Sequence, residues 1–284
     1  MHRSCAARAA ALLRFPFSSL AVALVAAACG AASPSAGTSL AVPARARHAP
    51  PLAAERPEAP PTAEQVLAAY VDATGGRAAR DGLVAMRMHG TFTIEKLGIS
   101  GPMDVIMEAP GRARTTIDLG RLGRQEQGCD GDVAWQKSES GVRILSGAER
   151  DRALRTSTIH NELLWRQLYK SVVLVGDAQI DGRPAWKLAL TSPDGEIEHR
   201  YFDKQSHLEV ASERTITTER GAVAALNRVV AYGQFGPVRM PKTIRQTMQT
   251  GLEITIAVQD VEWNPPLPPE AFQPPPARAQ GMRQ

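Results

Sequence analysis

The chain has 284 residues, with 33 Lys and Arg against 29 Asp and Glu, 43% hydrophobic residues and three cysteines. This length allows one large domain or two ordinary ones, and the composition excludes a collagen, a coiled coil, a disulfide-stapled mini-domain and a wholly disordered protein. The formal net charge of +4 raises the question of nucleic-acid binding, which depends on where the charges lie.

Residues 1–28 have the features of a secretory signal. Three arginines and no acidic residue accompany an apolar run that ends in three alanines at Ala28. A basic start, a short apolar stretch and small residues describe an export signal, which is too short to span a bilayer comfortably. The alanines followed by Cys29 resemble a bacterial lipobox, which implies that Cys29 is lipidated. Ordinary cleavage near Ala32 or Ala36 is the alternative.

The segments on either side of residues 62–272 are predicted to be disordered. Residues 29–61 are rich in Pro, Ala, Ser and Arg, and residues 273–284 are similar; 15 of the 21 prolines lie outside 62–264. Such segments bury too little apolar surface to offset the entropy of ordering. We therefore expect a signal peptide (1–28), a Pro/Ala-rich tether (29–61), one folded domain (62–272) and a tail (273–284).

The positive charge lies outside the predicted domain. Residues 62–272 contain 25 Lys and Arg against 27 Asp and Glu, so the domain is close to neutral. Few aromatics and no basic excess argue against a nucleic-acid surface. Cys129 is the one cysteine in this range, so an intramolecular disulfide is excluded there, and a small core residue is the expected role.

A helix is predicted at the start of the domain. Thr62 and Gln65 have the spacing of a capping box, and Gly75-Gly76 supplies a stop. The apolar residues between them form one face, which is typical of a helix that packs on a sheet. They are Val66, Leu67, Tyr70 and Val71.

Most of the remaining sequence alternates with a period of two. Apolar and polar residues alternate over about 84–95, 103–108, 112–119 and 133–135, and again over 186–190, 197–201, 208–210, 223–232 and 252–258, with Gly- and Pro-rich turns between them. One apolar face per strand and short turns indicate an antiparallel sheet. We expect a mainly β (α+β) fold, with a curved antiparallel sheet of about ten to eleven strands.

Residues 147–170 interrupt this alternation. Ile159, Leu163, Leu164 and Leu168 recur at helical spacing, which predicts one broken helix or two short ones, the second (about 158–169) being the more amphipathic. His160-Asn161-Glu162 stands at the start of that second helix, and helix capping is its simplest role.

No catalytic motif stands out, and the sequence predicts no enzyme, metal or cofactor. A nucleophile elbow, a P-loop, a zinc-protease motif and a dinucleotide fingerprint are all missing. His199 and His207 are the best candidates for acid–base or metal chemistry. A hydrolase would require His199 and nearby carboxylates to converge in a cleft.

The apolar side of the sheet is the candidate ligand site. It is rich in Met, whose flexible side chain suits irregular apolar partners, although such a face is more often plain core. A sheet of this many strands curls, and two short helices that fill it only partly would leave an apolar pocket. A fully packed face would instead favour a scaffold. The predicted cavity residues are Met86, Met88, Phe92, Met103, Val105, Met107, Trp135, Leu163, Leu164, Leu168, Trp186 and Leu188.

Short motifs in order along 62–272 resemble the LolA/LolB-like superfamily, and in particular bacterial proteins described as outer-membrane lipoprotein-sorting-protein-like. The matching segments are 69–76 (AYVDATGG), 128–135 (GCDGDVAW), 201–203 (YFD) before 208–210 (LEV), and 238–242 (VRMPK). The resemblance implies an unclosed β-barrel around an apolar cavity, with helices as a lid, that holds acyl chains. It implies no catalytic residues.

These observations together predict a lipoprotein of the bacterial cell envelope. We expect tethering through lipidated Cys29, binding of an acyl chain, a lipoprotein or another apolar ligand, and a role in lipid or lipoprotein trafficking. Gly30 after Cys29 is not the Asp that retains some lipoproteins at the inner membrane, so the outer membrane is favoured. The alternative is a non-enzymatic envelope sensor or scaffold that binds a protein partner through its sheet.

Overall fold

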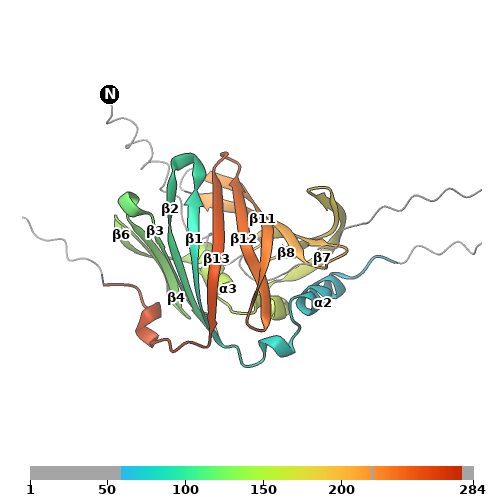
Figure 1. The fold of residues 1–284 in the computed structure, drawn as a ribbon, viewed down its shortest axis with the longest axis horizontal. Coiled ribbons are helices and arrows are strands. Elements are labelled where there is room, and N and C mark those ends of the chain that lie inside the picture. The colour runs from blue at the N-terminus through green and yellow to red at the C-terminus, as the bar shows by residue number, and fades with distance from the viewer. Residues whose placement is uncertain (1–58, 219–220, 277–284) are drawn as a thin grey trace, which may run out of the picture.

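A single antiparallel sheet of 13 strands dominates the computed structural model, which describes residues 59–218 and 221–276 (Figure 1). The strand order is β6-β5-β4-β3-β2-β1-β13-β12-β11-β10-β9-β8-β7. The strands are β1 (Ala85–Ile94), β2 (Ile99–Glu108), β3 (Arg112–Asp118), β4 (Arg124–Asp130), β5 (Ala134–Ser138), β6 (Gly141–Ile144), β7 (Ser171–Ile180), β8 (Arg183–Thr191), β9 (Ile197–Asp203), β10 (Glu209–Thr218), β11 (Gly221–Phe235), β12 (Val238–Met248) and β13 (Glu253–Trp263).

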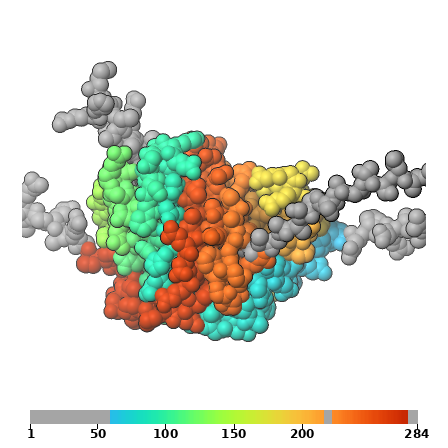
Figure 2. All heavy atoms as spheres, in the orientation of Figure 1, coloured from blue at the N-terminus to red at the C-terminus, as the bar shows by residue number. Residues whose placement is uncertain are grey.

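The predicted mainly β class and the curved, unclosed antiparallel sheet are confirmed. β1 pairs with β13, which joins the first and last strands at the centre, while β6 and β7 remain as the two edges. The chain therefore forms a half-barrel, with a concave inner face and an outer face. β1, β2, β12 and β13 form the surface toward the viewer in Figure 2.

The predicted number of ten to eleven strands is wrong, because strands such as β4 and β7 lack a regular alternation. β4 is almost entirely polar, and its buried apolar residue is Cys129. β7 opens instead with a continuous apolar run, Val172–Val175. Pairing with neighbouring strands, rather than their own pattern, places both in the sheet.

The predicted first helix is confirmed as α2 (Ala63–Ala73). Its capping box is formed: the Gln65 amide donates to Thr62 Oγ1 at 3.2 Å, and the Thr62 amide donates to Gln65 Oε1 at 2.7 Å. Leu67 and Tyr70 pack against β8 and β9, where the Tyr70 ring meets the Phe202 ring edge to face with centroids 5.2 Å apart. The helix thus covers the inner face at the β7 end of the sheet.

The predicted helical insert is also confirmed, although its halves differ from expectation. Residues 145–170, here called the crossing segment, run from edge strand β6 to edge strand β7 and contain α3 (Gly147–Thr156), the 3-10 turn η5 (Asn161–Leu163) and α4 (Trp165–Leu168). In Figure 1, α3 is seen behind the strands. The more regular helix is the first half, so the prediction of an amphipathic helix over 158–169 is wrong.

His160 explains this difference. Its backbone is left-handed (φ 55°), which ends regular helical structure at this point. The predicted capping role is wrong, since its side chain makes no cap bond and Nε2 lies 3.0 Å from the Leu83 carbonyl oxygen.

The remaining elements are four short 3-10 turns: η2 (Ala78–Arg80), η3 (Glu95–Leu97), η4 (Gly120–Leu122) and η6 (Pro269–Phe272). Within 59–218 and 221–276, no helix has the length and apolarity needed to cross a membrane.

The largest core cluster lies on β1, β2, β3, β12 and β13, and Ile159 of the crossing segment packs into it. Met88 and Met107 are each 1% exposed and Phe92 is 0% exposed. Methionine fits such a space because its unbranched thioether adapts to irregular gaps. This Met-rich face is therefore packed core rather than open surface.

Truncating a methionine of this face should destabilise the protein strongly. We expect Met88→Ala to lower the free energy of unfolding by about 2–5 kcal/mol, because it removes packed atoms and leaves a cavity. Urea denaturation checks this, with Val84→Ala, a 55% exposed residue just before β1, as the control expected to change stability by less than about 0.5 kcal/mol. A loss under 1 kcal/mol for Met88→Ala would indicate that the face borders empty space.

Candidate functional site

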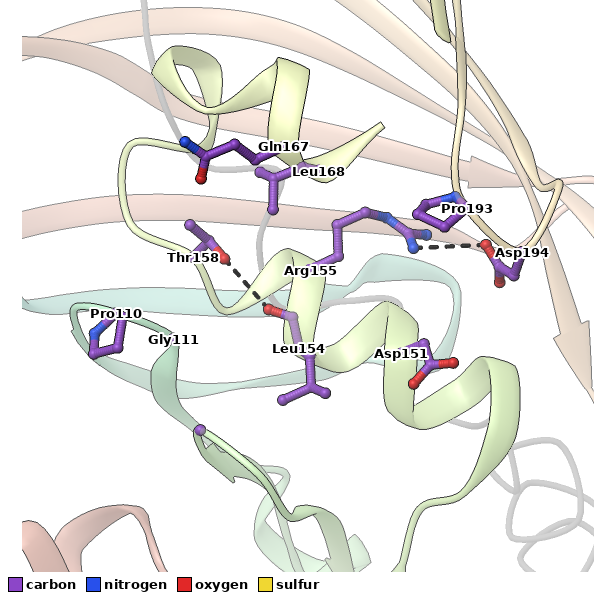
Figure 3. A pocket seen from close by; sticks show the side chains of 11 residues that line it. Pro110, Gly111, Asp151, Leu154, Arg155, Thr158, Gln167, Leu168, Pro193 and Asp194 are labelled. Atoms are coloured by element: carbon purple, nitrogen blue, oxygen red, sulfur yellow. Dashed lines mark hydrogen bonds and ion pairs between the residues drawn. The ribbon is translucent and has the colours of Figure 1, made fainter. Parts of the chain in front are cut away.

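A pocket of about 470 Å³ lies between the crossing segment and the turns at one end of the half-barrel (Figure 3). α3 and α4 supply two walls, and the β2–β3, β4–β5 and β8–β9 turns supply the rest. Its lining residues are Pro110, Gly111, Gly131, Asp151, Leu154, Arg155, Thr158, Gln167, Leu168, Pro193 and Asp194.

The pocket is apolar in part and charged at one end. Leu154 and Leu168 face it from the two helices, and Pro110 flanks it from the β2–β3 turn. Near the opposite turn, Arg155 Nη1 lies 3.7 Å from Asp194 Oδ1. A volume of this size falls within the range of about 300–1,000 Å³ that is usual for small-ligand sites. The arrangement suits an amphiphile, with a chain on the apolar walls and a polar group beside the charges.

Ion pairs fasten α3 to the β8–β9 turn. Arg152, 6% exposed, donates from Nε to Glu196 Oε2 at 2.9 Å, and Arg155 Nη2 lies 3.5 Å from the same oxygen. Burial acts to raise the pKa of the Asp194 carboxyl, but the Ser192 hydroxyl and the guanidiniums of Arg155 and Arg152 hold it below its usual value. These contacts hold α3 against the β8–β9 turn, and together the two form one side of the pocket.

A buried charge network extends from this wall to the inner face of β9 and β10. The Arg155 guanidinium lies 5.9 Å from the Tyr169 ring centroid, and the Tyr169 hydroxyl donates to Glu198 Oε2 at 3.3 Å. Arg200 donates to Glu198 Oε1 at 3.0 Å, and its Nη1 is 3.8 Å from Glu209 Oε2. The polar interior is thus continuous with the pocket.

Glu209 is the weakly partnered member of this network. Burial raises the pKa of its carboxyl to about 7; Arg200 opposes this rise, and the Glu198 and Glu162 carboxylates add to it. The pKa of Glu198 is instead lowered, because the guanidiniums of Arg200 and Arg214 outweigh the opposing effect of burial. Since Glu209 has poorer compensation, it changes charge near neutral pH.

A second contact fixes the middle of the crossing segment. Arg80 Nε donates to Glu162 Oε1 at 2.6 Å, and both side chains are almost fully buried. Arg80 also donates to the Gly76 carbonyl oxygen at 2.8 Å and to Thr74 Oγ1 at 2.7 Å, at the end of α2. The crossing segment is therefore tied to the first helix as well as to the β8–β9 turn.

A buried polar row crosses β10, β11 and β12 on the inner face. Asn227 Nδ2 donates to Ser212 Oγ at 3.2 Å, and Gln246 Nε2 donates to Asn227 Oδ1 at 2.8 Å. On the adjacent strand β13, Ile254 is opposite Gln246 and belongs to the Met-rich core. The inner face is hence divided into an apolar part at β1–β3 and β12–β13 and a polar part at β9–β11.

The structure places the predicted cavity residues in five separate groups, of which Trp135 alone forms the last. Six of them lie together in the packed Met-rich core, each at most 2% exposed: Met86, Met88, Phe92, Met103, Val105 and Met107. Trp186 and Leu188 belong instead to the cluster under α2. Leu163 and Leu164 are half-buried in the crossing segment. Leu168 lies in the pocket.

Trp135 is separated from the methionines by the sheet itself. Across the sheet, Trp135 is opposite Gly128 and Gly128 is opposite Arg114, so these three residues share one face. Met107 is opposite Ala113, the neighbour of Arg114, and therefore lies on the other face. The Trp135 indole Nε1 donates to the Phe272 carbonyl oxygen at 2.8 Å, so the C-terminal segment covers it on the outer face. The assignment of these twelve residues to one ligand cavity stays a prediction.

The two histidines singled out in the sequence do not form a cluster with acidic residues. His199 lies on β9 opposite Glu213, and burial together with Lys187 lowers the pKa of its imidazole. His207 is exposed in the β9–β10 turn. Among the residues that the structure describes, no group of three or more His, Cys, Asp or Glu side chains could hold a metal ion.

Most of the pocket residues were missed at the level of sequence. Pro110 and Pro193 stand in the Gly- and Pro-rich turns that the sequence predicts between strands, but the sequence contains no signal that brings these turns together. Arg155 occurs in a charged stretch that reads as a solvated helix face. The one available hint was the crossing segment itself, whose Leu168 was predicted to face a ligand.

No known family model and no curated protein sequence matches the chain. Solved structures do match it, and three of them have a TM-score of 0.52. A DUF1329 family protein from Desulfovibrio piger is 12% identical and covers 74% of this chain and 97% of its own. A putative outer membrane lipoprotein-sorting protein domain from Vibrio parahaemolyticus is 15% identical, with coverage of 74% and 97%. A LolA superfamily protein from Nitrosomonas europaea is 15% identical, with 75% and 98%. The fold is therefore LolA-like.

Neutralising Glu209 should change how stability depends on pH. Its pKa in the folded protein, about 7, exceeds the ordinary value of 4.5, so its stabilising contribution is complete below pH 4.5 and is lost as pH rises through 7. We expect Glu209→Gln to exceed the wild type in stability at pH 8, by on the order of 1–3 kcal/mol, with the difference shrinking toward pH 4.5. Urea titrations across this range measure it.

The exposed Glu139 supplies the matched control, since Glu139→Gln on the surface should change stability by less than about 0.5 kcal/mol. A Glu209→Gln protein that is less stable than the wild type at pH 8 would contradict the assignment of a near-neutral pKa.

Proposed function

We propose that the protein is an exported, membrane-tethered lipoprotein that binds the acyl chain of a lipid or lipoprotein, or another apolar ligand, at the mouth of its half-barrel. The pocket of about 470 Å³ beneath the crossing segment carries this proposal. Burying an acyl chain gains about 0.8 kcal/mol per methylene, so a pocket with apolar walls suffices without elaborate polar recognition. The LolA-like fold is consistent with this use.

The crossing segment acts as the lid of this site. It connects the two free edges of the sheet; charged contacts such as Arg152 with Glu196 hold α3 at the rim, whereas the core residue Ile159 and the buried Arg80–Glu162 pair hold the middle of the segment. Charged contacts at the rim weaken in salt and can exchange for water, unlike a packed apolar core. Local opening at α3 would therefore enlarge the pocket while the Met-rich core stays intact.

Ligand binding is tested by titration with a fluorescent fatty acid and displacement by unlabelled lipid. We expect Leu168→Asp to weaken binding at least tenfold, because a carboxylate in the apolar wall repels the chain. Val230→Asp is the control, since Val230 is 54% exposed and does not line the pocket; its affinity should match the wild type. Equal affinities for all three proteins would place the ligand elsewhere.

The tether is proposed from the sequence of residues 1–61, of which 1–58 lie outside the described residues. Cys29 after three alanines would carry the lipid, and the Pro-rich stretch to Pro61 would separate the domain from the bilayer. The absence of Asp after Cys29 favours the outer membrane, with the domain on the periplasmic side.

Replacing the lipidated residue should release the protein from the membrane. We expect Cys29→Ser to move the protein from the membrane fraction to the soluble periplasmic fraction, without changing the folded domain. Fractionation and the mass of the mature N-terminus measure this, with Cys129→Ser as the control that keeps the anchor. A mature N-terminus at another residue with no added lipid mass would contradict lipidation.

A second candidate function is a non-enzymatic sensor or scaffold that binds a protein partner through its sheet. The packing of the Met-rich face supports it, because a filled inner face leaves less room for a ligand there. If the delipidated wild type takes up no fatty acid or lipopeptide in the same titration, this second function is preferred.

A further inference from the structure

β7 is an unpaired sheet edge with unusual composition. Within the described strands it pairs with β8 alone. Its first five residues, Ser171–Val175, contain no charge, proline or glycine. The opposite edge, β6, is only four residues long and carries Arg143, which pairs with Glu149. Proteins ordinarily guard an edge by shortness, charge, proline or a bulge; β6 has the first two, whereas residues 171–174 of β7, which precede the bulge between Leu174 and Gly176, have none of them.

Large apolar side chains are exposed on the outer face beside this edge. Val173 and Val175 are 51% and 56% exposed, and Ile197 on β9 is 54% exposed. Val173 is opposite Ala189 on β8, and Ile197 is opposite Thr191, so they share the face away from α2. Among the seven large hydrophobic residues that are exposed in the described chain, these three gather at one corner.

We propose that β7 pairs antiparallel with β7 of a second copy of this chain, about a two-fold axis at Val173. An edge-to-edge pair would satisfy the free main-chain groups of both strands and continue the sheet from one copy into the other. The proposal goes beyond ligand binding and does not depend on it, because the pocket lies at the turns and the edge lies outside it.

The sequence of β7 is self-complementary in this register. Val173 meets Val173 of the second copy, and Leu174 meets Val172, so inner-face residues meet inner-face residues and outer meet outer. β7 has a bulge between Leu174 and Gly176, which inserts one residue into the strand. Beyond this bulge, Asp177 comes opposite Lys170 of the second copy.

Oppositely charged residues of the two copies therefore lie on both sides of the apolar centre of the paired strands. Lys170 is exposed and Asp177 has a 74% exposed side chain, where it meets Lys204 of its own chain. The two-fold axis creates two Lys170–Asp177 pairs. A different apolar strand would fill the edge equally well, but a second copy is the partner whose charges match at both ends. These matched charges favour a homodimer over pairing with another peptide.

Cysteine cross-linking at the axis tests the pairing directly. The full-length chain carrying Cys5→Ser and Cys29→Ser supplies the background, in which the remaining Cys129 is buried. Opposed residues in an antiparallel pair have Cβ atoms about 4.5–5.5 Å apart, which is within reach of a disulfide. We expect Val173→Cys to form a covalent dimer on mild oxidation at least tenfold faster than Ile144→Cys, an equally exposed site on β6.

Sedimentation velocity supplies the second measurement. The background protein should sediment as a concentration-dependent dimer, and Val173→Lys should raise the dimer dissociation constant at least tenfold. Its fatty-acid titration, and its melting temperature at concentrations too low for dimers, should stay unchanged. A background protein that remains monomeric through the micromolar range, or equal cross-linking rates at the two sites, would overturn the proposal. Unchanged dimerisation of Val173→Lys would overturn it as well. Failure of fatty-acid binding alone would leave the dimer unaffected, so the two proposals are separately testable.

Discussion

The architecture depends on one buried ion pair, between Arg80 and Glu162. The two side chains are 1% and 2% exposed, and Arg80 also bonds the Thr74 hydroxyl at the end of α2. Because β6 and β7 are consecutive in the chain yet stand at opposite edges of the sheet, the crossing segment must span the concave side. Breaking a buried pair leaves a charge uncompensated, at a cost of about 3–5 kcal/mol. The pair therefore fixes the first helix and the crossing segment as one unit.

The contact between α2 and the crossing segment explains why one part of the inner face is apolar and another part is polar. At the β1–β3 end, Ile159 of the crossing segment packs into the methionine core, which is closed to solvent. At the β9–β11 end, charged side chains such as Glu198 and Arg200 meet the underside of the same segment through Tyr169. Both ends are covered, so the remaining space lies where the segment meets the turns. A LolA-like half-barrel can thus retain a rigid core and still offer a site at its mouth.

Sequence patterns predicted the helices and strands whose apolar residues recur regularly. They missed the strands whose place in the sheet depends on pairing with neighbouring strands. The capping box at Thr62 and the alternation around Met86 and Met107 identified α2 and the central strands correctly. β7 escaped because an edge strand with Val exposed on one face and apolar residues packed under α2 on the other shows no alternation. Trp135 carried the apolar character expected of a cavity residue, but the register placed it on the outer face under Phe272.

The pocket was beyond sequence reasoning for a related reason. Its walls come from turns at Pro110, Gly131 and Pro193, which are far apart in the chain and become neighbours only when the sheet curves. The buried network around Glu198 was missed as well, because a charged residue on a strand is expected to face solvent until the packing on that face of the sheet is known. Curvature and tertiary cover, rather than local propensity, decided both features.

In the proposed function, an acyl ligand lies against the crossing segment at the mouth of the half-barrel and not against the Met-rich face. Photo-crosslinking with a diazirine-bearing fatty acid, followed by mass spectrometry of the labelled peptides, tests this most directly. We expect labels within residues 147–168 and at the turns near Pro110 and Pro193. Labels confined to the strands around Met88 and Met103, or no labelling that unmodified fatty acid competes away, would contradict it.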